Sequence, residues 1–130
     1  MEQHAKNKEF ILNYLNELRG VAKTRPFLEK FMADEVLIGH IEFFEKAFPF
    51  YDVIADEMTA ECNRVILKAR VMGTHTGDLG GIPPTFKEVN FPFAISYEIE
   101  NNMIVNHWMI ADQMSLMEQL GVVQGAEAAH

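Results

Sequence analysis

The hydrophobic pattern of this chain changes its period at Pro49, and this change constrains the fold more than any other feature. Before Pro49 the apolar residues recur every three or four positions, as they do on the buried side of a helix. After Pro49 they alternate with polar residues, as they do in a strand with one buried face. Helices followed by strands predict an α+β fold, in which the helices pack on one side of an antiparallel sheet.

Three helical segments are expected before this change of period. The first covers about residues 5–18, and the second begins with Thr24 as its N-cap and Pro26 in its first turn. A break is expected over residues 34–39, and the third helix follows at about residues 41–48. Each segment carries one apolar stripe, so all three should pack against a common core.

Four strands are expected after the change, over residues 51–60, 64–75, 91–99 and 103–111. The pair Asn101-Asn102 between the last two strands is a two-residue hairpin signal. The first and last strands carry apolar residues on both parities, which is typical of a sheet that is covered on both faces. We therefore predict a homodimer that packs through the sheet.

The charge balance and composition exclude several classes of partner. The net charge is −8, from 11 basic and 19 acidic residues, and no basic cluster is present that would bind a nucleic-acid backbone. No run of 18 apolar residues predicts a membrane span, and the first residues form no apolar signal segment. The single cysteine, Cys62, offers neither an intrachain disulfide nor a thiolate metal site. We expect a cytoplasmic protein with one domain over residues 1–130, a core at about residues 7–122 and a loose tail over residues 123–130.

The connection from Gly73 to Thr85 is longer than a hairpin requires and contains several glycines and two consecutive prolines. Glycine allows other groups to approach the backbone closely, and Pro83-Pro84 forces an extended, non-helical exit. One interpretation is a wide surface loop. The other is a loop that forms the mouth of a pocket, with His75 at the strand end beneath it.

Several pieces of the sequence, which occur in the expected order, together resemble the SnoaL-like polyketide cyclase (ester cyclase) family. They are Ala47-Phe48-Pro49, Gly73-Thr74-His75-Thr76-Gly77, Gly81-Ile82-Pro83-Pro84-Thr85, His107-Trp108 with Asp112, and Gln119-Leu120-Gly121-Val122. The resemblance covers about residues 7–122. It implies a cystatin-like, cone-shaped α+β barrel of the nuclear transport factor type, with the N-terminal helices in the concave face of a curved sheet.

The resemblance also implies an activity. Cyclases of this family close a ring by an intramolecular aldol reaction, with an acidic residue as acid and base and with neither metal nor cofactor, and they usually form dimers through the sheet. Isomerases and dehydratases share the fold. This chain departs from the family pattern where relatives often carry Asp after the Trp (Met109 here), Asp after Phe-Pro (Phe50) and Gly after Pro-Pro-Thr (Phe86).

The family's acid corresponds best to Asp112, with His75 as its assistant, and we expect no metal and no cofactor. Candidate contacts to a small hydrophobic substrate are Trp108, Phe44, Val71, Phe93 and Ile110. His107 has the opposite parity to Trp108, which favours the outer face of the sheet or a dimer contact. Each candidate also has a structural interpretation, since Asp112 stands where a helix N-cap is expected, and His75 and Trp108 fit a plain core.

Two functions therefore remain open at this point. The first is a cofactor-independent enzyme of the cyclase, isomerase or dehydratase kind that acts on a hydrophobic small molecule. The second is a non-catalytic module that binds a hydrophobic metabolite in the same cone. A polar pair deep in the cavity favours the enzyme, whereas an Asp112 that is engaged as a cap, beside a purely apolar cavity, favours the binding module.

Overall fold

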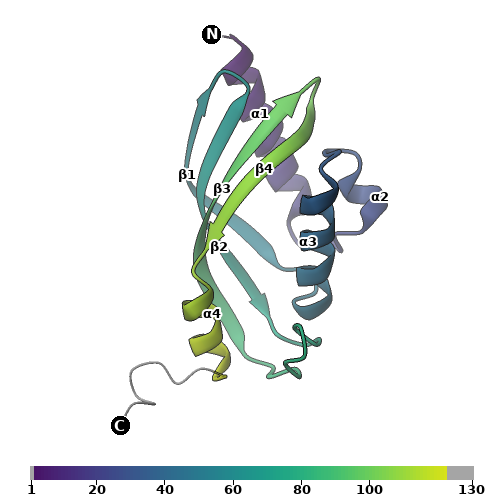
Figure 1. Ribbon diagram of the computed structural model, residues 1–130, viewed down its shortest axis with the longest axis vertical. Helices are drawn as coiled ribbons and strands as arrows, with labels where there is room; N and C mark the ends of the chain where they lie inside the picture. The colour runs from purple at the N-terminus through teal and green to yellow at the C-terminus, as the bar shows by residue number, and fades with distance from the viewer. Residues whose placement is uncertain (1, 123–130) are drawn as a thin grey trace.

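The computed structural model of the chain describes residues 2–122, so the expected tail over residues 123–130 lies outside the described residues. The described part contains the expected helices and strands in the expected order (Figure 1). They are α1 (Glu2–Leu18), α2 (Arg25–Leu28), α3 (Glu35–Ala47), β1 (Asp52–Glu61), β2 (Arg64–Thr74), β3 (Glu88–Glu100), β4 (Met103–Ala111) and α4 (Gln113–Leu120). None of these helices has both the length and the apolar character that a membrane span requires.

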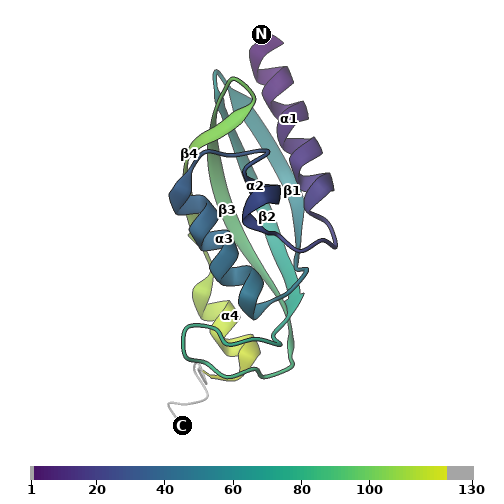
Figure 2. The ribbon, with the colours of Figure 1, turned by 90° about the vertical axis from the view of Figure 1, so that its right-hand side faces the viewer.

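The four strands form one antiparallel sheet in the order β1-β2-β3-β4. The sheet is curved, and α1 and α3 lie on its concave side while α4 extends from the end of β4 (Figures 1 and 2). The predicted α+β fold, with helices packed in the concave face of a curved antiparallel sheet, is thus confirmed. The hairpin at Asn101-Asn102 has positive φ at both residues, 51° and 59°, as a two-residue turn with the right twist requires.

The third helix begins earlier than the sequence pattern predicted. The Asp34 carboxylate accepts a hydrogen bond from the backbone N–H of Leu37 at 3.0 Å, so Asp34 is the N-cap and α3 starts at Glu35. The expected break over residues 34–39 is therefore wrong. Gly39 disfavours a helix by about 1 kcal/mol relative to Ala, but Leu37 and Ile38 bury their side chains in the core and outweigh it.

Two β-bulges reverse the alternation of the outer strands. The register passes from Ala55 to Glu57 on β1, and from Asn106 to Ile104 on β4, so that Asp56 and Val105 are the extra residues. An extra residue moves all later side chains to the opposite face. The mixed parity of these strands therefore follows from the bulges, and it does not require a sheet that is covered on both faces.

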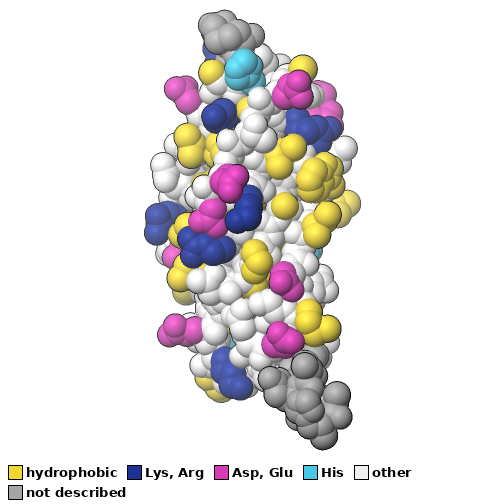
Figure 3. All heavy atoms as spheres, turned by 90° about the vertical axis from the view of Figure 1, so that its left-hand side faces the viewer, with side chains coloured by type: hydrophobic (Ala, Val, Ile, Leu, Met, Phe, Trp, Pro, Cys, Tyr) yellow, Lys and Arg dark blue, Asp and Glu magenta, His cyan; other side chains and the backbone are white. Residues whose placement is uncertain are grey.

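The convex face of the sheet carries charged pairs and exposed hydrophobic side chains (Figure 3). Arg70 pairs with Asp56 at 2.9 Å, and Arg64 lies 3.8 Å from Glu98. Hydrophobic side chains gather on one side of this face, where the figure shows them in yellow. The convex face is thus partly apolar and open to solvent.

Candidate functional site

A cavity of about 510 Å³ lies between the helices and the concave face of the sheet. This volume is within the range of about 300–1,000 Å³ that is typical of small-molecule sites. Most of the lining is apolar, and none of the lining residues is Asp, Glu, Lys or Arg. The polar side chains of the lining are Tyr14, His40, Tyr51, Tyr97 and Gln113.

All three tyrosines of the chain line this cavity. Tyr14 belongs to the apolar stripe of α1, Tyr51 precedes β1, and Tyr97 shares the inward parity of β3 with Ile95. The exposed fractions of the three residues are only 2%, 7% and 3%. The rings of Tyr14 and Tyr97 meet edge to face at a centroid distance of 6.1 Å, and Tyr51 lies in the wall of the same cavity.

The tyrosine hydroxyls open onto the cavity. Within residues 2–122, only Glu45 Oε1 and His75 Nε2 are fully buried side-chain atoms without a hydrogen-bond partner. The three hydroxyls make none of the hydrogen bonds of the described residues and yet are absent from that pair, so they must be reachable from the cavity. Buried hydroxyls usually find partners, and these three are free to bind a ligand oxygen.

The environment keeps these hydroxyls protonated. Burial is the main cause that raises the pKa of Tyr14, Tyr51 and Tyr97 well above the ordinary value near 10, because the charged phenolate is poorly solvated there. The neighbouring tyrosines raise the pKa of Tyr14 further. The cavity therefore offers O–H donors, and it does not offer a phenolate base.

His40 on α3 is the one imidazole in the lining. It lies at the edge of the cavity, one turn of helix before Phe44, and its own outer surface is exposed. Burial first, and then the charge of His107, lower the pKa of His40 below the ordinary value of 6.5. The neutral imidazole, which can accept a proton, is therefore favoured at neutral pH.

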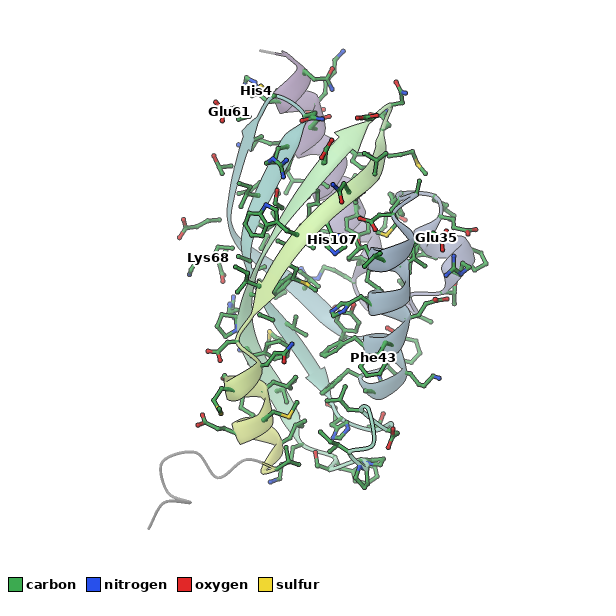
Figure 4. The ribbon with its side chains drawn as sticks, in the orientation of Figure 1. His4, Glu35, Phe43, Glu61, Lys68 and His107 are labelled. Carbon is green, nitrogen blue, oxygen red and sulfur yellow. The ribbon has the colours of Figure 1, made fainter. Side chains whose placement is uncertain are left out.

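His107 lies between β4 and α3 (Figure 4). Its Nδ1 is 2.6 Å from Oδ2 of Asp34, whose other oxygen caps α3. The sequence pattern placed His107 on the outer face, and this prediction is wrong because the bulge at Val105 turns His107 inward, beside Tyr97. The Asp34–His107 pair joins the start of α3 to the sheet.

The glycines of the long connection have a packing reason. A Cβ on Gly77 would lie within 2.0 Å of the Lys46 carbonyl oxygen, because the backbone N–H groups of Thr76 and Gly77 both donate to Ala47 at 3.1 Å. Only glycine allows this approach. The connection thus holds the end of α3, and its Leu79, Gly80 and Ile82 form part of the cavity wall.

A model of the SnoaL-like polyketide cyclase family matches residues 9–120. The chain belongs to this family. Solved structures agree on the fold: AclR from Streptomyces galilaeus, a proposed hydroxylase, has a TM-score of 0.81 at 21% identity over 97% of this chain and 90% of its own. A proposed SnoaL-like polyketide cyclase from Jannaschia sp. CCS1 has a TM-score of 0.79 at 18% identity over 95% and 96%.

IdmH from Streptomyces antibioticus, a proposed polyketide cyclase, has a TM-score of 0.73 at 19% identity, over 89% of this chain and 99% of its own. No curated protein matched the chain. At these identities the structures share the fold, and a fold alone does not select a reaction. The activity of this member of the SnoaL-like family depends on the residues of its cavity.

Three of the five predicted substrate contacts lie in the wall of the cavity. Phe44, Val71 and Phe93 line the cavity. Trp108 and Ile110 do not, since they project from the convex face with 45% and 69% of their surface exposed. The prediction that these two line the pocket is wrong, because it counted parity through Val105 without the bulge.

The structure does not bring Asp112 and His75 together. Asp112 is exposed and accepts a hydrogen bond from the N–H of Ser115 at 2.9 Å, as the N-cap of α4. Its backbone N–H bonds to Pro92, whereas that of His75 bonds to Lys87, five positions earlier and thus about 16 Å away along an extended strand. Neither residue lines the cavity, so the predicted shared pocket is wrong.

His75 is held as a core residue at the end of α3. Its Nδ1 accepts a hydrogen bond from the backbone N–H of Thr85 at 3.1 Å, and its ring stacks on Phe48 at a centroid distance of 5.2 Å. His75 is completely buried. Direct catalytic roles for His75 and Asp112 remain predictions, to be tested by substitution.

Sequence reasoning missed the tyrosines and His40. The inward parity of Tyr97 and the place of Tyr14 in its helical stripe were both visible in the sequence. A tyrosine, which carries a polar hydroxyl, among the apolar residues of a buried face is the signal that could have identified Tyr14 and Tyr97 as cavity residues. His40 was missed because the third helix was expected to begin only at about residue 41, whereas α3 begins at Glu35 and includes His40. Among residues 2–122, no cluster of three or more His, Cys, Asp and Glu is placed to hold a metal ion.

Proposed function

We propose that this protein is a cofactor-independent enzyme of the cyclase or isomerase type, which moves a proton at the carbon next to a carbonyl group of a hydrophobic small molecule. One observation carries the proposal: three unpartnered tyrosine hydroxyls open onto an uncharged cavity that has a neutral imidazole at its edge. The apolar lining suits a hydrophobic ligand, and the hydroxyls suit its oxygen atoms.

The residues divide the chemistry between them. The tyrosine hydroxyls donate hydrogen bonds to the carbonyl oxygen, and these bonds strengthen as negative charge develops there. His40 takes the proton from the adjacent carbon, which leaves an enolate and an imidazolium. The enolate carbon then forms a C–C bond to a second carbonyl carbon, whose π electrons move to its oxygen, and the imidazolium returns the proton to that alkoxide. If the proton returns to carbon, the result is an isomerisation.

One observation favours the alternative, a module that binds a hydrophobic metabolite without turnover. No carboxylate lines the cavity, since position 109, where relatives often carry Asp, is Met, and Asp112 is engaged as a helix cap. Neutral tyrosines and a histidine can bind a ketone without reacting with it. The two functions therefore share a ligand class and differ in proton transfer.

A deuterium-exchange experiment separates the two functions. 2-Tetralone, a hydrophobic ketone, is incubated with the protein in D₂O, and NMR follows both its binding and the loss of the hydrogens next to its carbonyl. The enzyme proposal expects exchange well above the rate in buffer. Binding without added exchange would support the binding module, and the absence of both would contradict the assignment of the cavity to hydrophobic ketones.

We further propose a homodimer that packs through the convex face. Trp108 and Ile110 support it, because they leave a large apolar surface exposed on the same side of the sheet. We also propose a cytoplasmic location, which the exposed, unpaired Cys62 supports because free thiols persist in reducing compartments.

A further inference from the structure

Lys23, in the connection between α1 and α2, is almost completely buried, with 1% of its surface exposed. Its ammonium nitrogen lies 3.0 Å from the Val21 carbonyl oxygen, 3.6 Å from Glu45 Oε1 and 4.4 Å from the ring centroid of Tyr51. One carbonyl hydrogen bond, one carboxylate at ion-pair distance and one aromatic face thus surround this nitrogen, and all three favour the charged ammonium form.

A buried lysine is costly, because burial disfavours its charge. Burial lowers the pKa of Lys23, while the charges of Glu45 and Asp52 oppose the change. Salt bridging alone gives no reason to keep this charge inside the protein, since a buried pair often stabilises a fold no better than apolar residues do. The position of the ammonium group indicates a role for it, since it lies against the face of the Tyr51 ring, which lines the cavity.

A cation on the face of a phenol ring acts on the hydroxyl as well as on the ring. It is attracted to the π electrons, and it draws electron density away from the O–H bond, which makes the hydroxyl a stronger donor. On another side, Phe44 meets Tyr51 edge to face at 4.9 Å, so the ring is held between the ammonium and an aromatic neighbour. Tyr14 and Tyr97 have no lysine ammonium on their faces among the described residues.

We propose that Lys23 is a positioning residue for Tyr51: its buried ammonium fixes the ring and strengthens the Tyr51 hydroxyl as a donor to a bound ligand oxygen. This deepens the proposed function and rests on it only for the ligand. It gives the Tyr51 hydroxyl a support that the described residues do not give to Tyr14 or Tyr97.

The test uses the folded protein without ligand. All tyrosines are replaced by 3-fluorotyrosine, which ionises at lower pH than tyrosine, and ¹⁹F NMR follows each ring as pH rises; Tyr51→Phe assigns the signal. Because burial first and then Glu45 raise the pKa of Tyr51, the comparison is made between Glu45→Gln and Lys23→Met/Glu45→Gln. These two proteins differ only in the lysine. Loss of the ammonium should move the ionisation of residue 51 up by about one pH unit.

Lys23→Arg in the Glu45→Gln background should restore most of that difference, because it returns a cation, which a purely structural role would not require. If Lys23→Met does not fold, Lys23→Gln serves in its place, since an amide retains a donor for the Val21 carbonyl. Equal ionisation of residue 51 with and without the ammonium would overturn the proposal. So would the absence of any ionisation of this ring in the Glu45→Gln protein below the pH of unfolding. Neither result depends on ketone exchange.

Discussion

The two faces of the sheet carry different kinds of residue, and the difference separates binding from assembly. The concave face presents three tyrosines and apolar side chains to the cavity, without an acidic or basic group in its lining. The convex face presents charged and hydrophobic side chains (Figure 3). Its charged residues include the Arg70–Asp56 ion pair, and Trp108 and Ile110 are exposed on the same face. Most of the residues that make the family motif conspicuous are therefore outside the cavity, where they cap a helix, fill the core or meet solvent. The residues that would select a ligand lie in ordinary apolar stripes.

The largest expected effect of a substitution on the concave side is at His40. We expect His40→Gln to lower ketone exchange about 10²- to 10⁴-fold, because general acid–base catalysis is worth that much and glutamine cannot accept the proton. In the wild-type protein the rate should persist somewhat below pH 6.5 and fall as His40 becomes protonated, since the pKa of His40 is lowered and only its neutral form is a base. The measurement is the exchange rate of 2-tetralone as a function of pH.

His4→Gln is the matched control for this prediction, since it makes the same change at a histidine of α1 outside the cavity lining. It should leave both the rate and its pH profile unchanged. An unaltered rate in His40→Gln would remove the proton acceptor from the proposed mechanism.

The next largest effect is expected at Tyr97 on the concave face. Tyr97→Phe keeps the ring and removes one hydroxyl that makes no hydrogen bond in the described residues, so thermal stability should change little. Loss of one donor to a developing oxyanion typically costs about 10²- to 10³-fold in rate. Exchange kinetics and thermal melting of the same sample check both halves of this statement. A large loss of stability with normal exchange would show that the hydroxyl serves the fold.

On the convex face the expected effect is on assembly. Trp108→Asp should weaken the proposed homodimer about thirtyfold or more, because an interface Trp is often worth 2 kcal/mol or more. Sedimentation equilibrium of wild type and variant gives the two dissociation constants, and ketone exchange should be retained. Leu12→Asp, which changes a residue of similar exposure on α1, is the control and should leave the dimer intact. A monomeric wild-type protein at micromolar concentration would refute the dimer itself.

The smallest effect is expected at Asp112. As an N-cap, Asp112→Ala should cost about 1 kcal/mol of unfolding free energy, and Asp112→Asn should cost almost nothing, since Asn caps about as well as Asp. Chemical denaturation measures both values. If Asp112→Asn unfolds like wild type but loses ketone exchange, the carboxylate has a catalytic role that its exposed position does not suggest.

The general architecture was predictable because periodicity and caps are local signals. Thr24 and Asp112 as N-caps, Gly121 at the end of α4 and the turn at Asn101-Asn102 follow from residue chemistry within a few positions. The bulges were not predictable in the same way. On β4 the residues Ile104, Trp108 and Ile110 share parity throughout, and nothing local marks Val105 as the extra residue.

The site was less predictable than the fold, because it depends on which residues meet across the chain. Tyr14 and Tyr97 are 83 positions apart and meet only because α1 crosses the concave face of the sheet. Phe50 and Phe86 illustrate the opposite case. Both have positive φ, 62° and 60°, a conformation that Gly and Asp adopt more readily than Phe, and nothing in the structure explains why this chain has Phe there.

The net negative charge of the protein, with no basic group in the cavity lining to offset it, affects how fast charged compounds reach the cavity. A protein of net charge −8 repels anions over about 8–10 Å at physiological ionic strength, so acidic metabolites approach it more slowly than neutral ones of the same size. Discrimination against them thus begins during diffusion, before any contact with the tyrosines. Added salt should speed the association of a carboxylate-bearing analogue and leave that of a neutral ketone unchanged.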